Sequence, residues 1–167
     1  MLVLRRLTPR VFDPSQPPNQ DHPESWKVFG VCETENPLSL RFLRSLSEKG
    51  WSDTDKRAAL GAAMKLIHRA QSGQSIENQF DAKQCHWADE FKIYNKKTKK
   101  IWRLWLGGVV RIYFCYGADK SIVVAWPIRK REDSLTEKEK CELRAVFGEF
   151  FEAQDKSKIK YIMMDER

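Results

Sequence analysis

Three neighbouring runs rich in β-branched and aromatic residues, at 101–106, 109–116 and 122–128, constrain the fold of this chain more than any other feature. Runs of this composition are typical of β-strands. Gly107 and Gly108 separate the first two runs, and residues 117–120 separate the second from the third. Connections this short join antiparallel neighbours, so the runs predict a three-stranded antiparallel meander. The third run is apolar at nearly every position, and we expect its strand to be central and buried on both faces.

Helix-start and helix-stop signals precede the meander. Asn36 and Ser52 are typical N-caps, and Gly50 and Gly73 are typical helix stops, so two helices are expected between them. Apolar residues recur at helical spacing in both segments, which predicts a helical hairpin. A short strand is expected before this hairpin, at 26–31, where the sequence reads Trp-Lys-Val-Phe-Gly-Val.

A further helix is expected after Thr136, with its apolar residues on one side. Together these elements predict an α+β fold. An antiparallel sheet, made of the short N-terminal strand and the three-stranded meander, packs against the N-terminal helical hairpin and the C-terminal helix. The length of 167 residues is typical of one domain. Prolines crowd residues 1–24 and predict an extended arm, residues 25–155 form the expected domain, and residues 156–167 form a charged tail.

Positive charge is concentrated in one segment. No acidic residue lies between Phe91 and Ala118, and the rest of the chain has 23 basic and 23 acidic residues, so this window carries the whole net charge of +7. Such a concentration favours a polyanionic partner, because neutralised phosphates release counterions. A solvated lysine-rich loop at 96–100 is the alternative. The cations of the window are Lys92, Lys96, Lys97, Lys99, Lys100, Arg103 and Arg111.

Several classes of protein are disfavoured by the sequence. The four cysteines and three histidines are dispersed and form no Cys-x-x-Cys pair, so we expect no metal site, no cofactor and reduced, structural cysteines. Cys85 adjoins His86, but sequence neighbours rarely form a nucleophile and base pair. No apolar run is long enough to span a bilayer, and the N-terminus lacks the apolar core of a secretory signal. A cytoplasmic protein that does not associate with a membrane is expected.

Alternation along the first two runs assigns side chains to faces of the sheet. Arg103 and Trp105 share one side of their strand, and Arg111 and Tyr113 share one side of the next. A bulged three-residue connection would place all four on a common open surface, basic and furnished with rings that stack on bases. A two-residue glycine turn would instead mix the faces, so we favour the bulged connection. The alternatives are that Trp105 and Tyr113 pack at a sheet edge and that Arg111 pairs with an internal Asp or Glu.

The same segments resemble a known family. The sequence Ile-Trp-Arg-Leu-Trp-Leu-Gly-Gly-Val-Val-Arg-Ile-Tyr-Phe resembles the strand–turn–strand of RelE/ParE-type toxins, with an arginine just after the turn. Ile-Val-Val-Ala-Trp-Pro-Ile-Arg-Lys-Arg is similar to the apolar strand that ends in a basic cluster in that family. Leu-Thr-Glu-Lys-Glu-Lys resembles the HigB-like branch. The resemblance covers about residues 26–153, and its distinctive part lies within 101–140.

This resemblance implies a RelE-like toxin of a type II toxin–antitoxin system, an endoribonuclease that cleaves mRNA, often on the ribosome, and is neutralised by a cognate antitoxin. Some relatives poison gyrase instead. Carried over by position, Arg103, Arg111 and Arg131 would contact the scissile phosphate. Tyr113 is a weaker candidate acid. The tyrosine or histidine that many members carry beyond the basic cluster is absent and Glu137 stands nearby, so the identity of the general acid stays open.

Metal-independent RNA cleavage proceeds by attack of the ribose 2′-hydroxyl on the adjacent phosphorus. It needs a proton acceptor, a proton donor and cations around the developing dianion. A non-catalytic RNA- or DNA-binding protein, a gyrase-directed toxin and an adaptor that meets only protein are the alternatives. The residues expected to bind RNA are Lys96, Lys97, Lys99, Lys100, Trp105, Arg129 and Lys130.

Overall fold

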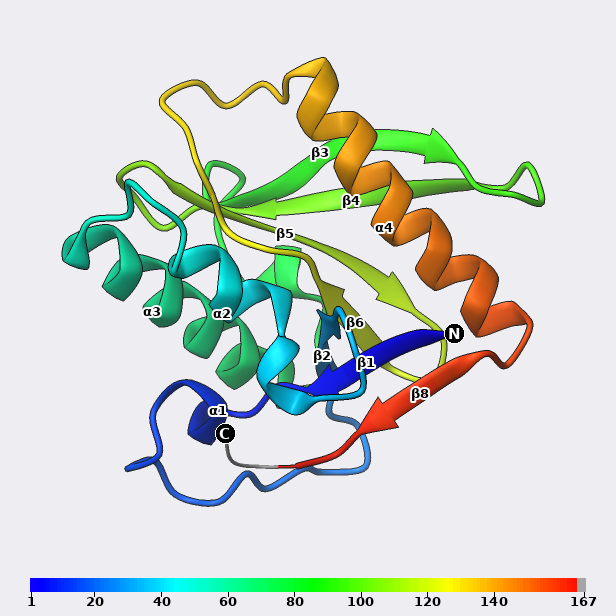
Figure 1. The fold of residues 1–167 in the computed structure, drawn as a ribbon, viewed down its shortest axis with the longest axis horizontal. Helices are drawn as coiled ribbons and strands as arrows, with labels where there is room; N and C mark the ends of the chain where they lie inside the picture. Colours follow the sequence, from blue (N-terminus) through cyan, green and yellow to red (C-terminus); the bar gives the residue numbers. More distant parts are fainter. Residues whose placement is uncertain (165–167) are drawn as a thin grey trace.

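The computed structural model describes residues 1–164, which form one open, mostly antiparallel sheet and four helices (Figure 1). The strands are β1 (Leu2–Arg6), β2 (Lys27–Cys32), β3 (Cys85–Lys92), β4 (Thr98–Leu104), β5 (Val110–Gly117), β6 (Ser121–Val124), β7 (Ile128–Arg129) and β8 (Ile159–Ile162). The helices are α1 (Pro9–Phe12), α2 (Arg41–Leu46), α3 (Asp53–Ala70) and α4 (Glu137–Asp155). The strand order is β3-β4-β5-β6-β2-β1-β8, with β7 beside β5. The predicted α+β class is confirmed, and the sheet has more strands than predicted.

Strands β3 to β6 pair in sequence order, each antiparallel to the next. Arg103 on β4 lies opposite Tyr113 on β5. This register requires an odd number of residues in the connection, and it keeps the two sets of side chains that alternation predicted on opposite faces of the sheet. Strand β6 is buried at every position and lies inside the sheet, as predicted. The third predicted strand ends early because Pro127 has no N–H to donate, and the chain resumes pairing with β5 only at β7.

Both ends of the described part of the chain contribute a strand to the sheet, which corrects the predicted arm and tail. Strand β1 lies between β2 and β8 and is buried at all five positions. Strand β8 pairs with β1 in parallel. The segment after β1 is also held, because Arg6 donates two hydrogen bonds to Asp21, of 2.8 and 2.9 Å. The boundaries proposed at residues 24 and 155 therefore cut through one sheet, while residues 165–167 of the predicted tail lie outside the described part.

Strand β3, at one edge of the sheet, was missed in a stretch that the sequence analysis left without an element. Its register shifts between Trp87 and Asp89, where a β-bulge is inserted. A bulge moves the following side chains to the other face. Residues 85 and 87 therefore lie on the sheet face that α3 covers. Asp89 and Phe91 lie on the opposite face, together with His86, which is the strand partner of Arg103.

The predicted caps of the two long helices are present. The Ser52 side chain accepts a hydrogen bond from the Asp55 amide, and Thr136 and Glu139 form a capping box at the start of α4. The first helix of the hairpin is shorter than predicted. It begins only at residue 41, because Leu40 is fully buried and forms a β-bridge with Cys32.

Each face of the sheet is covered by a different helix. Side chains of α3 pack with Leu104, Ile112 and Phe114 on one face, and side chains of α4 pack with Ile101 and Tyr113 on the other. In Figure 1, α4 crosses β4 and β5, and the turn of the β3–β4 hairpin extends beyond the neighbouring strands. Within residues 1–164 no helix has the length and apolar character to cross a membrane.

Candidate functional site

Two buried arginines from neighbouring strands meet at one carboxylate. Arg103 on β4 and Arg111 on β5 are 2% and 5% exposed. The carboxylate belongs to Asp133, in the segment that joins β7 to α4. Its Oδ1 lies 3.1 Å from Arg103 Nε and accepts a hydrogen bond of 3.2 Å from Arg111 Nε. Residues far apart in the sequence thus form one charged cluster on the α4 face of the sheet.

The prediction of a common open surface is wrong. Arg103, Arg111 and Tyr113 do share a face, as alternation predicted, but the start of α4 and the segment before it cover that face. Arg111 has an internal acidic partner, which was the alternative reading of its mid-strand position. Its Nη1 also donates to the carbonyl of Lys130, so backbone of the covering segment helps to hold it.

His86 on β3 is the third member of the cluster. Its Nε2 lies 3.1 Å from Asp133 Oδ2, and Arg103 Nη2 lies 2.7 Å from its Nδ1. A proton on Nε2 satisfies both charged neighbours, because Nε2 then donates to Asp133 while Nδ1 accepts from Arg103. The Ala82 carbonyl, 2.9 Å from Nδ1, favours the other tautomer. The imidazole can therefore carry its proton on either nitrogen, and its side chain is 37% exposed.

The cluster has more positive charge than its single carboxylate balances. Burial alone would raise the pKa of Asp133, but the hydrogen bond from Arg111 and the charge of Arg103 outweigh it and lower the pKa. Burial lowers the pKa of Arg103, and the neighbouring charge of Arg111 lowers it further, while Asp133 opposes both. Buried ions each carry a desolvation penalty of several kcal/mol, so two guanidinium groups against one carboxylate leave an incompletely compensated site.

Hydrogen-bond donors are also in excess. Arg103 Nη1 and Nε and the Tyr113 hydroxyl are buried without a hydrogen-bond acceptor in the described part of the chain. Arg103 Nε is close enough to Asp133 for an ion pair, but the angle is not that of a hydrogen bond. A buried donor without an acceptor costs about 1–3 kcal/mol. The site therefore suits an anion with more oxygen atoms than a carboxylate has.

The two aromatic residues of the predicted surface are not free stacking platforms. The Trp105 ring centroid lies 6.0 Å from the guanidinium carbon of Arg103 and 5.8 Å from that of Arg111, so the ring covers both cations. Its Nε1 donates to the Gly108 carbonyl at 2.8 Å. Tyr113 is fully buried, and burial raises the pKa of its hydroxyl. The expectation that Tyr113 reaches a substrate as an acid is therefore corrected.

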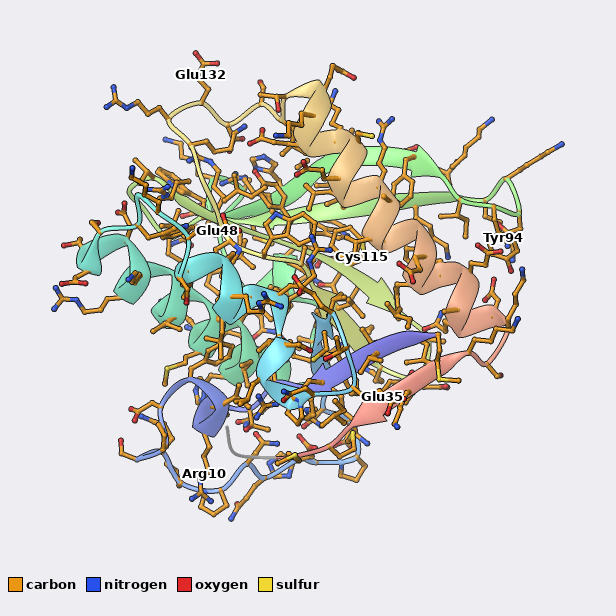
Figure 2. All side chains as sticks on the ribbon, viewed as in Figure 1. Arg10, Glu35, Glu48, Tyr94, Cys115 and Glu132 are labelled. Atoms are coloured by element: carbon orange, nitrogen blue, oxygen red, sulfur yellow. The ribbon has the colours of Figure 1, made fainter. Side chains whose placement is uncertain are left out.

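The predicted basic segment divides into two groups. Lys96 and Lys97 lie in the turn of the β3–β4 hairpin, where Figure 2 labels the neighbouring Tyr94. Lys99 lies over the Phe151 ring and Lys100 over the Trp87 ring, at 4.8 and 5.5 Å from the centroids. Four residue steps of extended strand, about 13 Å, separate Lys99 from Arg103. The lysines therefore lie at the start of β4 or in the turn before it, and Arg103 lies near the end of β4.

A groove of about 850 Å³ lies between the hairpin and α4. Both acidic and basic side chains line it, so the groove is not a basic surface. Its charged lining residues are Glu90, Lys92, Glu137, Lys140, Arg144, Glu149 and Glu152.

The remaining predicted contacts, from the basic cluster after β6, do not act as a group. Arg131 is exposed and has no hydrogen bond, ion pair or ring contact with another described residue. Arg129 donates to the Gly50 carbonyl and lies 4.6 Å from the Trp51 ring, on the side of the α2–α3 connection. Lys130 pairs with Glu139 and is 9% exposed. Lys130 is therefore engaged within the fold rather than free to bind RNA.

His86 and Asp133 were not among the residues selected from the sequence. The apolar alternation at 85, 87, 91 and 93 was a signal for a strand that carries His86. No local signal marks Asp133, because its partners are 22 and 30 residues away along the chain. Comparisons with family models, curated proteins and solved structures give no match to this chain.

Proposed function

We propose that this protein is the toxin of a type II toxin–antitoxin system, a metal-independent endoribonuclease that cleaves mRNA and is neutralised by a cognate antitoxin. The observation that carries the proposal is the convergence of Arg103, Arg111 and His86 at one anion, the Asp133 carboxylate. These are the side-chain types that cleavage by a 2′-hydroxyl requires. The resemblance of residues 101–140 to RelE/ParE-type toxins adds support from the sequence.

The two arginines bind the scissile phosphate and stabilise the dianion that develops during attack. A guanidinium group keeps its charge at neutral pH and can bind two phosphate oxygens through its planar fork. Because both groups are held by strand pairing and by backbone carbonyls, they need little reorganisation on binding.

His86 accepts the proton of the attacking hydroxyl. It supplies the acid–base group that is missing at the position expected from the resemblance, and it does so from the edge strand β3. Its partly exposed side chain and its hydrogen bonds within the cluster suit this role. A positioned general base contributes about 10²–10⁴-fold to a rate.

A RelE-like arrangement is part of the proposal. A strand, two helices, consecutive antiparallel strands and a final helix follow one another in β2, α2, α3, β3–β6 and α4. In this view β1 and β8 are additions at the far side of β2. The antitoxin is an acidic protein that covers the basic hairpin and the arginine cluster.

The test is cleavage of a mixed-sequence RNA by the purified protein in EDTA, with the same sequence as DNA for comparison. We expect products with 2′,3′-cyclic phosphate and 5′-hydroxyl ends from RNA and no product from DNA. Arg111→Lys keeps the positive charge but lacks the planar guanidinium group that binds two phosphate oxygens, so this variant should lose most of the cleavage activity. Arg57→Lys is the matched control, because Arg57 is an exposed residue of α3 outside the cluster. Expression without antitoxin should arrest growth for the wild type and the control only.

A second candidate, an RNA-binding protein without cleavage activity, is favoured by one observation. Asp133 already forms ion pairs with both arginines, as it would in a purely structural cluster. Retention of RNA without any cleaved product, for the wild type and for Arg111→Lys alike, would select this candidate. DNA damage on induction with intact mRNA would instead select a gyrase-directed toxin.

A further inference from the structure

The Asp133 carboxylate has the contacts that a phosphate group would have. One oxygen faces the Nε atoms of Arg103 and Arg111, and the other faces His86 Nε2, all within 3.2 Å. Such a set of donors around one anion is typical of phosphate recognition by arginine. The carboxylate therefore lies where the proposed ribonuclease would hold a phosphate.

A carboxylate fills this position incompletely. It offers two oxygens, whereas a phosphodiester offers two free oxygens and two ester oxygens, spread more widely. Arg103 Nη1 and the Tyr113 hydroxyl have no acceptor among residues 1–164, although both residues are at least 98% buried. Tyr113 is the strand partner of Arg103, so both unused donors come from residues on the same part of the sheet. The cluster thus has donors to spare for an anion larger than a carboxylate.

Asp133 can leave without disrupting the groups that hold it. Its side chain is 48% exposed, whereas its arginine partners are buried and anchored by β4 and β5. Residues 131–134 form an exposed bend with no helix or strand pairing. The bend is fixed at its two ends by Lys130, which pairs with Glu139, and by the buried Leu135. Figure 2 shows Glu132, the neighbour of Asp133, pointing away from the protein.

We propose that Asp133 is an intramolecular mimic of the substrate phosphate, which closes the anion site and is displaced when a phosphate group binds. This inference deepens the proposed function, because the displacing group would be the scissile phosphate of the RNA. The apparent affinity of such a site is the intrinsic affinity reduced by the fraction of molecules that are open. The bend 131–134 moves outward on binding while the arginines keep their places.

The test measures binding of inorganic phosphate by calorimetry for the wild type, Asp133→Ala and Glu132→Ala. Glu132→Ala is the matched control, since it removes the same charge from the same exposed bend. If the closed state holds more than about nine-tenths of the molecules, Asp133→Ala binds phosphate at least about tenfold more tightly than Glu132→Ala. Equal or weaker binding by Asp133→Ala would show that Asp133 is only a structural partner of the arginines.

A second measurement uses the wild-type protein and does not depend on any variant folding. Saturating inorganic phosphate should speed trypsin cleavage after the exposed Arg131, because the bend is released. Unchanged or slower cleavage there would overturn the proposal. Neither readout involves RNA cleavage. Absence of cleavage together with tighter phosphate binding by Asp133→Ala would therefore reject the nuclease and retain the phosphate site.

Discussion

Arg144 on α4 donates two hydrogen bonds to Asp89 on the edge strand β3, at 2.7 and 2.8 Å, and so ties the helix to the bulged strand. Asp89 is buried, with 7% of its side chain exposed. Arg144→Ala leaves this carboxylate without its partner and should lower the free energy of unfolding by about 1–3 kcal/mol. Urea denaturation measures the change.

The control for this prediction is Lys138→Ala on the same helix. Lys138 is 86% exposed and its pair with Glu142 spans 4.0 Å, so its loss should change the free energy of unfolding by less than about 0.5 kcal/mol. Equal effects of the two substitutions would contradict the role assigned to Arg144.

His86→Gln should slow cleavage of RNA at saturation by about 10²–10⁴-fold, because glutamine cannot accept the proton of the attacking hydroxyl. Single-turnover kinetics measure the rate, and RNA affinity should change little. His68→Gln serves as the control, since His68 is an exposed residue of α3. A His86→Gln enzyme with the wild-type rate would remove the histidine from the mechanism.

Lys96 and Lys97 should contribute to affinity for RNA and not to the chemical step, because they lie in the hairpin turn at the far end of β4 from the arginines. Replacing both by Gln should reduce the slope of log affinity against log salt by about 0.7 per lysine. The cleavage rate at saturation should stay the same. Lys49→Gln, at an exposed position before α3, is expected to leave the slope unchanged.

Stability should fall in acid, in part because of Asp133. Its folded pKa is lower than its ordinary value, so between these two pH values the unfolded chain binds a proton that the folded chain does not. The stabilisation is therefore complete above about pH 4 and is lost as the pH falls through the folded pKa. Urea denaturation of Asp133→Asn between pH 7 and 3 should show a weaker pH dependence than the wild type. Identical pH dependence would argue against the ion pairs of Asp133.

Only Cys141 should react with iodoacetamide in the folded protein. Cys141 is exposed on α4, whereas Cys32, Cys85 and Cys115 are buried and all four are free. Burial raises the pKa of Cys85 to about 12, so little reactive thiolate forms there at neutral pH. Mass spectrometry should find one added group in buffer and four in urea, and none in buffer for Cys141→Ser.

Local sequence signals identified the elements whose partners are close in the chain. The glycine connection and alternation gave the β4–β5 register, and the caps at Ser52 and Thr136 gave the starts of α3 and α4. Each of these signals acts over a few residues, through backbone conformation, a short turn or a single side-chain hydrogen bond. Alternation also placed Arg103 and Arg111 on one face of the sheet.

Only the tertiary structure decided which groups surround those arginines. Strand β1 and strand β8 are too short to be recognised alone. They are stable because β1 pairs with β2 on one side and with β8 on the other. The bulge in β3 directs Asp89 toward α4, and the bend before α4 brings Asp133 to the arginines. These contacts join residues tens of positions apart, and such pairings depend on the packing of the whole sheet rather than on any local pattern.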